Sequence, residues 1–295
     1  MFVKEKLLMA ADGIVNVWYR QSSIRWLLPL LALSIIVVHW QFTDVQSGQL
    51  LFEVHRLGQV SFFESRYLYF YAHLFALIPV LALSFDRKVA YFREWKYLLP
   101  ALLLVAIPYW IWDIAKTAAG VWGFNPRYYS FLLLNLPIEE WLFFLTFPFA
   151  SVFIYCCLNA WLPDTAMLRW LQRREKFITA LLIAVFFGIG MVNWGKAYTV
   201  TSFWIAGFLL LWQSLYGSAT IRVLFYRLMP IATFAFIVVN SVFTGSFTEQ
   251  PIVVYNPEEY LGIRFLSIPL DDFSYNFGLQ MGVICLYEWF KNSRF

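Results

Sequence analysis

The hydrophobic pattern of the chain consists of long apolar runs separated by short polar connections. Apolar runs of about 17 to 25 residues match the thickness of a bilayer when they form helices. We find eight such runs and predict that each forms a transmembrane helix. They are centred on residues 24–40, 67–85, 97–112, 137–158, 177–192, 198–216, 223–242 and 269–290.

Two motifs occur in the same order in both halves of the chain. An aromatic-Asn-Pro step is followed by a proline, one apolar residue and two adjacent acids. The copies are Phe124-Asn125-Pro126 with Pro137-Ile138-Glu139-Glu140, and Tyr255-Asn256-Pro257 with Pro269-Leu270-Asp271-Asp272. An even number of spans per half gives both halves the same orientation. We therefore predict an all-α polytopic membrane protein of about eight helices, arranged as two parallel four-helix repeats.

This repeat divides the chain into four segments. Residues 24–158 and 177–295 form the two repeats, and residues 159–176, which contain a proline and four basic residues, form a linker. Residues 1–23 form a cytoplasmic leader that mixes charged and apolar residues. Two alternatives remain open for the leader: an amphipathic helix on the inner membrane surface, or an ordered segment packed under the bundle.

Composition and charge agree with a membrane location. The chain is 61% hydrophobic and only 14% charged. Lys and Arg are enriched in cytoplasmic connections of membrane proteins. If both termini are cytoplasmic, 16 of the 22 basic residues fall in inner segments. We therefore predict an integral protein of the cell membrane, with cytoplasmic N- and C-termini and both acidic pairs toward the outer leaflet. This bias accounts for the net charge of +4 without nucleic acid as a partner.

Residues that cofactor-dependent enzymes need are missing. The three histidines, His39, His55 and His73, do not form the cluster that a di-iron centre requires. No strand-linked G-x-G-x-x-G or Walker sequence occurs. The pair Asp271-Asp272 lacks the further Asp and the basic cluster of a magnesium-diphosphate site. We expect neither a metal nor a cofactor.

The two acidic pairs are the leading candidates for chemistry. Glu139 and Glu140 follow Pro137 in the first turn of a predicted helix, and Asp271 and Asp272 follow a proline in the same way. Acids at a helix N-terminus can simply complement the helix dipole, but two matching copies favour a function. Carboxylic acids packed against aromatic rings can stay protonated near neutral pH and protonate an apolar substrate.

Further candidates surround the acids. Asp113, at the end of a predicted span, is a third candidate acid; a helix-end role or a contact with Lys116 is the structural alternative. Arg264 is expected to keep one acid ionised while the other titrates. Aromatic rings can stabilise a carbocation, or they can simply form the interfacial belt and the core. The candidate substrate-binding residues are Trp110, Trp122, Phe124, Asn125, Phe143, Phe144, Asn240, Tyr255, Asn256, Arg264 and Phe273.

Taken together, these motifs resemble the non-flavin lycopene cyclases, which occur as small heterodimers and as fused proteins. The chain looks like the fused form, although Asp271 stands where the family often has Glu. The two acidic sites are therefore not expected to be equally competent. The matching residues are Trp112-Asp113, Gly120-x-Trp122-x-Phe124-Asn125-Pro126, Leu136-Pro137-Ile138-Glu139-Glu140-x-x-Phe143-Phe144, Asn240, Thr244-Gly245, Tyr255-Asn256-Pro257, Leu261-Gly262-x-Arg264 and Ile268-Pro269-Leu270-Asp271-Asp272-Phe273.

This resemblance implies redox-neutral cyclisation of the linear ends of lycopene to β-ionone rings by an intramolecular lyase, or isomerase. An acid protonates the terminal double bond, the neighbouring double bond attacks the resulting cation, and a base removes a ring proton. Glu140 and Glu139 are the leading acid and base. Asp271 and Asp272 form an equivalent pair or complete one composite site. The residues expected to orient these acids are Asp113, Asn125, Asn240, Asn256 and Arg264.

The expected partners are lycopene or a related linear carotenoid, and membrane lipid. Association with a second copy or with other carotenoid-pathway enzymes stays open, as do the ring type and the carotenoid length. One alternative is a tandem-repeat transporter that uses the acids as proton or cation sites; another is a carotenoid hydratase or binding protein of the same fold. A transporter should place its ionisable groups near mid-membrane. Here they lie at helix ends, which favours an enzyme.

Overall fold

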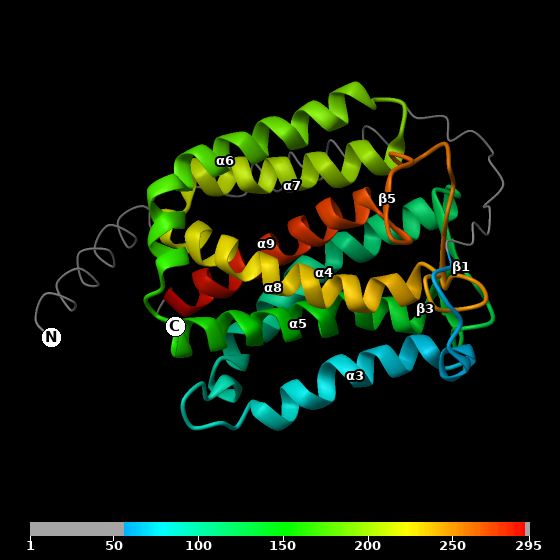
Figure 1. The fold of residues 1–295 in the computed structure, drawn as a ribbon, viewed down its shortest axis with the longest axis horizontal. Helices are drawn as coiled ribbons and strands as arrows, with labels where there is room; N and C mark the ends of the chain where they lie inside the picture. The colour runs from blue at the N-terminus through cyan, green and yellow to red at the C-terminus, as the bar shows by residue number, and fades with distance from the viewer. Residues whose placement is uncertain (1–55, 293–295) are drawn as a thin grey trace, which may run out of the picture.

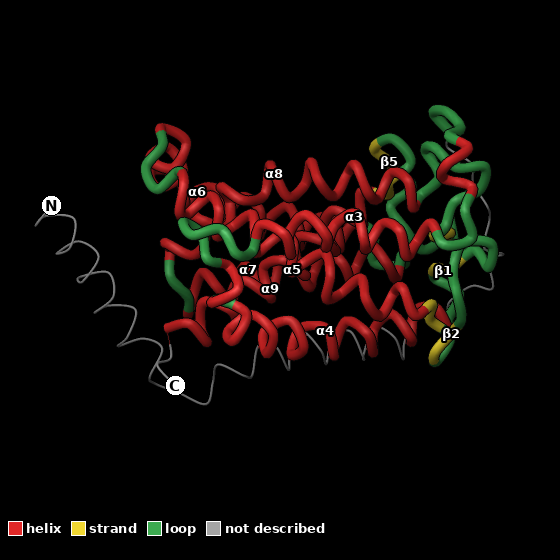
Figure 2. The backbone as a smooth tube through the Cα atoms, turned by 90° about the horizontal axis from the view of Figure 1, so that it is seen from below, coloured by secondary structure: helices red, strands yellow, loops and turns green. Residues whose placement is uncertain are grey.

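The computed structural model describes residues 56–292, which form a bundle of helices capped at one end by short strands (Figures 1 and 2). The predicted leader and the first predicted span lie outside the described residues. Two 3-10 helices, η2 (Ser61–Glu64) and η3 (Tyr91–Arg93), flank the first described α-helix. The α-helices of the described part are α3 (Leu68–Leu83), α4 (Trp95–Ala118), α5 (Ile138–Trp161), α6 (Ala166–Val192), α7 (Ala197–Tyr216), α8 (Ala219–Phe243) and α9 (Leu270–Asn292).

The helices follow the predicted apolar runs, and the largest differences are at two ends. α4 continues six residues beyond the predicted end at 112, so that Asp113 lies inside the helix. α6 begins at Ala166, which makes most of the predicted linker 159–176 helical. The side chain of Thr165 accepts a hydrogen bond from the backbone of Leu168 (3.1 Å) and so caps this helix. The basic residues that indicated a linker lie on the first turns of α6.

Four helices, α4, α5, α6 and α8, are long and apolar enough to cross a membrane. α3 is shorter, and large apolar side chains such as Phe75 and Ile78 on α3 and Phe234 on α8 are exposed on the outside of the bundle. These features are compatible with a membrane protein. The prediction of eight spans in two four-helix repeats concerns more of the chain than the described residues cover.

The cap joins the two halves of the chain. β1 (Trp122–Phe124) pairs antiparallel with β4 (Val253–Tyr255), with Gly123 opposite Val254. Two hairpins lead directly into α5 and α9: they are β2 (Leu132–Leu133) with β3 (Leu136–Pro137), and β5 (Arg264–Phe265) with β6 (Ile268–Pro269). Each proline therefore ends a strand, and the helix begins one residue after it rather than at it. A strand end tolerates proline because the missing N–H need not join the ladder.

Backbone contacts in the cap recur at a constant spacing along the chain. Four backbone hydrogen bonds form two pairs, in which the donor and the equivalent acceptor of the second bond lie 131 or 132 residues from those of the first. As a result, α5 and α9 each begin at the same position after the hairpin that precedes them. The bonds are Asn125 N to Ile252 O, Asn256 N to Val121 O, Ile138 N to Phe131 O and Leu270 N to Ile263 O.

Candidate active site

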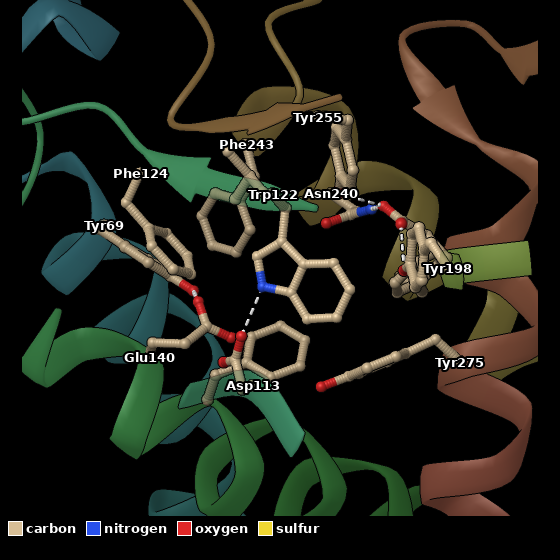
Figure 3. A pocket seen from close by; sticks show the side chains of 14 residues that line it. Tyr69, Asp113, Trp122, Phe124, Glu140, Tyr198, Asn240, Phe243, Tyr255 and Tyr275 are labelled. Carbon is tan, nitrogen blue, oxygen red and sulfur yellow. Dashed lines mark hydrogen bonds between the residues drawn. The ribbon is translucent and has the colours of Figure 1, made fainter. Parts of the chain in front are cut away.

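A cavity lies between the cap and the first turns of α5 and α9 (Figure 3). The space within its walls, open mouth included, is about 470 Å³. Both halves of the chain contribute to it. It is lined by Tyr69, Asp113, Trp122, Phe124, Glu140, Phe143, Tyr198, Phe236, Asn240, Phe243, Val253, Tyr255, Asp272 and Tyr275.

One acid of each predicted pair lines this cavity, and its neighbour does not. Glu140 and Asp272 line the wall and are 7% and 5% exposed. Glu139 instead accepts hydrogen bonds from the backbone N–H (3.0 Å) and the hydroxyl (2.6 Å) of Ser130. Asp271 accepts hydrogen bonds from the Thr199 hydroxyl (2.5 Å) and the backbone of Leu261 (3.2 Å). Adjacent residues on a helix lie about 100° apart, so one member of each pair fastens the cap while the other faces the cavity.

The Glu140 side of the cavity carries two acids. The hydroxyl of Tyr69, the second residue of α3, donates a hydrogen bond to Glu140 Oε2. Asp113 Oδ1 accepts a hydrogen bond from the indole of Trp122 (2.5 Å), and within the described residues Asp113 Oδ2 is buried without a partner. The two carboxyl groups lie next to each other (Figure 3). None of the described residues that line the cavity is Lys, Arg or His.

The Asp272 side of the cavity is rich in hydrogen-bond donors. The hydroxyl of Tyr198, the second residue of α7, donates to Oδ1 at 2.6 Å. The Asn240 amide (2.7 Å) and the Tyr255 hydroxyl (2.8 Å) donate to Oδ2. Burial, and then the charge of Asp272, raise the pKa of Tyr255 well above its usual value, so this phenol stays protonated and keeps donating. Three donors thus converge on one carboxylate.

Aromatic rings fill the wall between the two acid groups. The ring of Trp122 lies 4.9 Å from that of Tyr198, and the ring of Tyr275 stacks 4.8 Å from Trp112. The hydroxyl of Tyr275 reaches the centre of the cavity from α9 (Figure 3). This wall presents several π faces to whatever occupies the space.

Six predicted substrate-binding residues do not line the cavity. They are Trp110, Asn125, Phe144, Asn256, Arg264 and Phe273. The amide of Asn125 donates to Gln250 Oε1 (3.0 Å) and Pro251 O (3.1 Å), which holds the cap together. The guanidinium of Arg264 donates to the carbonyl of Ser267 (2.6 Å) and the hydroxyl of Tyr260 (3.1 Å), so it serves the β5–β6 turn. Asn125 and Arg264 therefore fasten the cap and do not contact the cavity.

Six lining residues did not enter the predicted site: Tyr69, Tyr198, Phe236, Phe243, Val253 and Tyr275. The repeat contains a signal for two of them, because Tyr198 follows Tyr69 by 129 residues, close to the spacing of the acids. Tyr275 likewise follows Phe143 by 132 residues, the spacing of the acids themselves. The remaining three are ordinary apolar residues in apolar runs, and no sequence pattern distinguishes them.

The fold and the site define a helical, membrane-compatible protein with buried acids in an aromatic cavity. The sequence model of the lycopene cyclase family matches residues 66–158 and 195–290, and the chain belongs to this family. Each matched stretch contains one Asn-Pro step and one acidic pair, which confirms the resemblance seen in the sequence. Membership indicates a lycopene cyclase-type function, that is, an enzyme that acts on carotenoids. Neither the curated proteins nor the solved structures contain a match.

Proposed function

We propose that this protein is a lycopene β-cyclase that converts the linear ends of lycopene to β-ionone rings. The supporting observation is that Glu140, Asp113 and Asp272, drawn from both halves, surround a single aromatic cavity. A hydrocarbon substrate offers no group to hydrogen-bond, so the protein must supply the acid, the base and the surface that stabilises the cation. The reaction class is an intramolecular lyase, or isomerase, with no cofactor.

Glu140 acts as the proton donor, with Asp113 as its partner. Two adjacent buried carboxylates without a cation among the lining residues repel each other, and this repulsion favours keeping one proton on the pair. Transfer of that proton to the terminal double bond leaves a tertiary cation on the polyene. The neighbouring double bond then attacks this cation and closes the ring.

Asp272 acts as the base. A carboxylate that accepts hydrogen bonds from three donors is stabilised in its ionised form. It attracts the ring cation and removes a ring proton, so the product has the same composition as the substrate. This assignment replaces Glu139, the base expected from the sequence, because the contacts of Glu139 with Ser130 lead away from the cavity. Both rings of the product are then made in one composite site, one end after the other.

Expression in cells that accumulate lycopene, followed by pigment analysis, tests this proposal. Wild type should form β-carotene, whereas Glu140→Gln and Asp272→Asn should each leave lycopene uncyclised. Two independent sites would instead let each single variant form rings. The matched control is Asp164→Asn, which removes an exposed acid paired with Arg169 at the other end of the bundle. Unchanged lycopene with wild type would count against cyclase activity itself.

The proposed topology has eight spans in two parallel four-helix repeats, residues 24–158 and 177–295, with both termini in the cytoplasm of a cell-membrane protein. The connections α3–α4, α5–α6 and α7–α8 and the end of α9 lie at the end of the bundle opposite the cap (Figure 1). Basic residues concentrate there, which supports a cytoplasmic location for that end. A fluorescent protein fused after Phe295 should fluoresce, and a cysteine at Ile263, which is 55% exposed in the cap, should react with an impermeant maleimide.

A further inference from the structure

The helix α9 packs more closely on α4 than α5 packs on α8. Gly278 and Gly282 of α9 lie at the contact: a Cβ at Gly278 would come within 2.9 Å of the Tyr109 hydroxyl, and one at Gly282 within 3.4 Å of Val105. Small residues four apart let helices approach in this way. The positions 132 residues earlier on α5 carry the larger residues Thr146 and Ala150, and α5 contacts α8 less extensively than α9 contacts α4. The bundle is therefore tight on one side of the cavity and looser on the α8 side.

Phe236 forms the cavity wall on this looser side. It lines the cavity from α8 and is half-buried. Tyr109, which lies 127 residues earlier on α4, is 6% exposed and packs inside the bundle with its ring 5.2 Å from that of Tyr275. Tyr109 therefore fills space inside the bundle on the α4 side, whereas Phe236 itself lines the cavity from α8, beside Asn240 and Phe243.

A row of phenylalanine rings connects this wall with the outside of the bundle. The ring of Phe236 lies 5.4 Å from that of Phe273 on α9, which in turn lies 6.2 Å from that of Phe265 on β5. Phe265 is 49% exposed, and the nearby α8 residues Phe234 and Val238 are 69% and 45% exposed. Phenylalanine rings make no hydrogen bonds with one another, so they can turn aside at low cost.

In the first repeat, the contact equivalent to that between α8 and α9 is the one between α4 and α5, and we call it the tryptophan seam. A hydrogen bond holds it together. Trp141, 132 residues before Phe273, packs on Trp110 with 5.1 Å between the rings. The indole of Trp110 donates to the carbonyl of Trp141 (3.1 Å), and the indole of Trp141 donates to the carbonyl of Leu133 (3.1 Å). Opening this seam would break the hydrogen bond between Trp110 and Trp141, and an indole N–H left unpaired is costly in lipid.

We propose that the linear carotenoid enters the cavity from the lipid between α8 and α9, and that Phe236 and Phe273 form the gate. This inference rests on the proposed function, since it names the route of the same substrate to the same acids. A carotenoid dissolved in the bilayer needs an apolar opening at the depth of the helices. The phenylalanine row offers that opening, whereas the hydrogen-bonded tryptophans hold the equivalent position between α4 and α5 closed.

Bridging the two seams with a short bifunctional thiol reagent tests the gate in the full-length protein. The double variant Phe236→Cys/Phe273→Cys bridges the proposed gate, and Trp110→Cys/Trp141→Cys bridges the tryptophan seam. Each rate is compared with that of the same variant before bridging and with the treated single variants. Bridging the gate should lower kcat/KM for lycopene in vesicles by roughly tenfold or more, and bridging the tryptophan seam should change it less than twofold. An equal effect at both seams, or none at the gate, would overturn the proposal.

A labelling experiment covers the case in which the double variant at the gate is inactive before bridging. A lipid-soluble maleimide should react with Phe236→Cys, and lycopene in the vesicles should slow that reaction several-fold. The same reagent on Trp110→Cys should show no protection by lycopene. Equal protection at both positions, or none at residue 236, contradicts entry past Phe236. Failure of wild type to cyclise lycopene contradicts the proposed function instead, and the two failures are distinguishable.

Discussion

The two sides of the cavity share one scaffold and differ in their charge. On each side a tyrosine in the first turn of a helix donates to the second acid of a pair: Tyr69 to Glu140, and Tyr198 to Asp272. The decisive difference is one residue of the helix before each cap, which is Asp113 on the first side and Asn240 on the second. An amide donates to the neighbouring acid, whereas a carboxyl group competes with it for protons. In the proposed mechanism, this exchange between the two repeats separates the proton donor from the proton acceptor.

The largest expected effect comes from removing that difference. Asp113→Asn gives the first side the same residue as the second, so Glu140 loses its acidic partner and becomes a stabilised carboxylate. Cyclisation should fall by about 10²- to 10⁴-fold, the usual contribution of a positioned acid or base. The measurement is the initial rate of ring formation in membranes, normalised to the amount of folded protein. Wild-type activity of this variant would remove Asp113 from the mechanism.

The next largest effects are expected from the two tyrosines that donate to the acids. Tyr69 is the donor found for Glu140 within the described residues, whereas Tyr198 is one of three donors to Asp272. A hydrogen bond to a charged group contributes about 1.5–3 kcal/mol, so Tyr69→Phe should lower kcat by roughly 10- to 100-fold. Tyr198→Phe should cost only a few-fold, because Asn240 and Tyr255 still hold Asp272. Equal losses would contradict this distribution of donors. A fall in kcat without a rise in KM separates positioning of the acid from general damage to the cavity.

The reverse exchange tests the base. Asn240→Asp places a second carboxyl group beside Asp272, and the pair should then share a proton, as proposed for Asp113 and Glu140. We expect a loss of about tenfold, smaller than for Asp113→Asn because Tyr198 and Tyr255 still donate to Asp272. The loss relative to wild type should shrink at higher pH, where the pair at residues 240 and 272 gives up its proton. A pH-independent loss would show that the Asn240 amide serves only to shape the wall.

Much of this site could be predicted from the sequence because duplication leaves a regular spacing. The acids, Trp122 and Tyr255 belong to the two repeated motifs or lie within a few residues of them. Which member of an acidic pair faces the cavity could not be predicted, because it depends on where the helix begins. The hairpin fixes that point through the bond from Ile138 N to Phe131 O, and a shift of one residue would bring Glu139 to the cavity.

The same holds for the fold: features set by local sequence could be predicted, and features set by tertiary packing could not. Apolar runs predicted the described helices, since a helix that crosses a bilayer must be apolar along its length. The helical character of most of 159–176 was not predicted, because basic residues on the first turns of α6 resemble a polar connection. The place of Phe236 in the cavity wall depends on how α8 packs in the bundle, which no local pattern encodes.

The smallest expected effect concerns a polar contact between the halves outside the cavity. Arg127 pairs with Glu249 (2.6 Å) and Glu64 (3.2 Å) on the surface of the cap, and its side chain is 39% exposed. Exposed ion pairs contribute about 0–1 kcal/mol, and salt screens them further. Arg127→Gln should therefore lower Tm by a few degrees at most and leave the rate of cyclisation unchanged. Thermal unfolding in detergent at low and high salt, beside the pigment assay, measures both. A loss of activity comparable to that of Tyr69→Phe would mean that the cap controls the cavity through this ion pair, and that charge differences between the halves matter beyond the cavity wall.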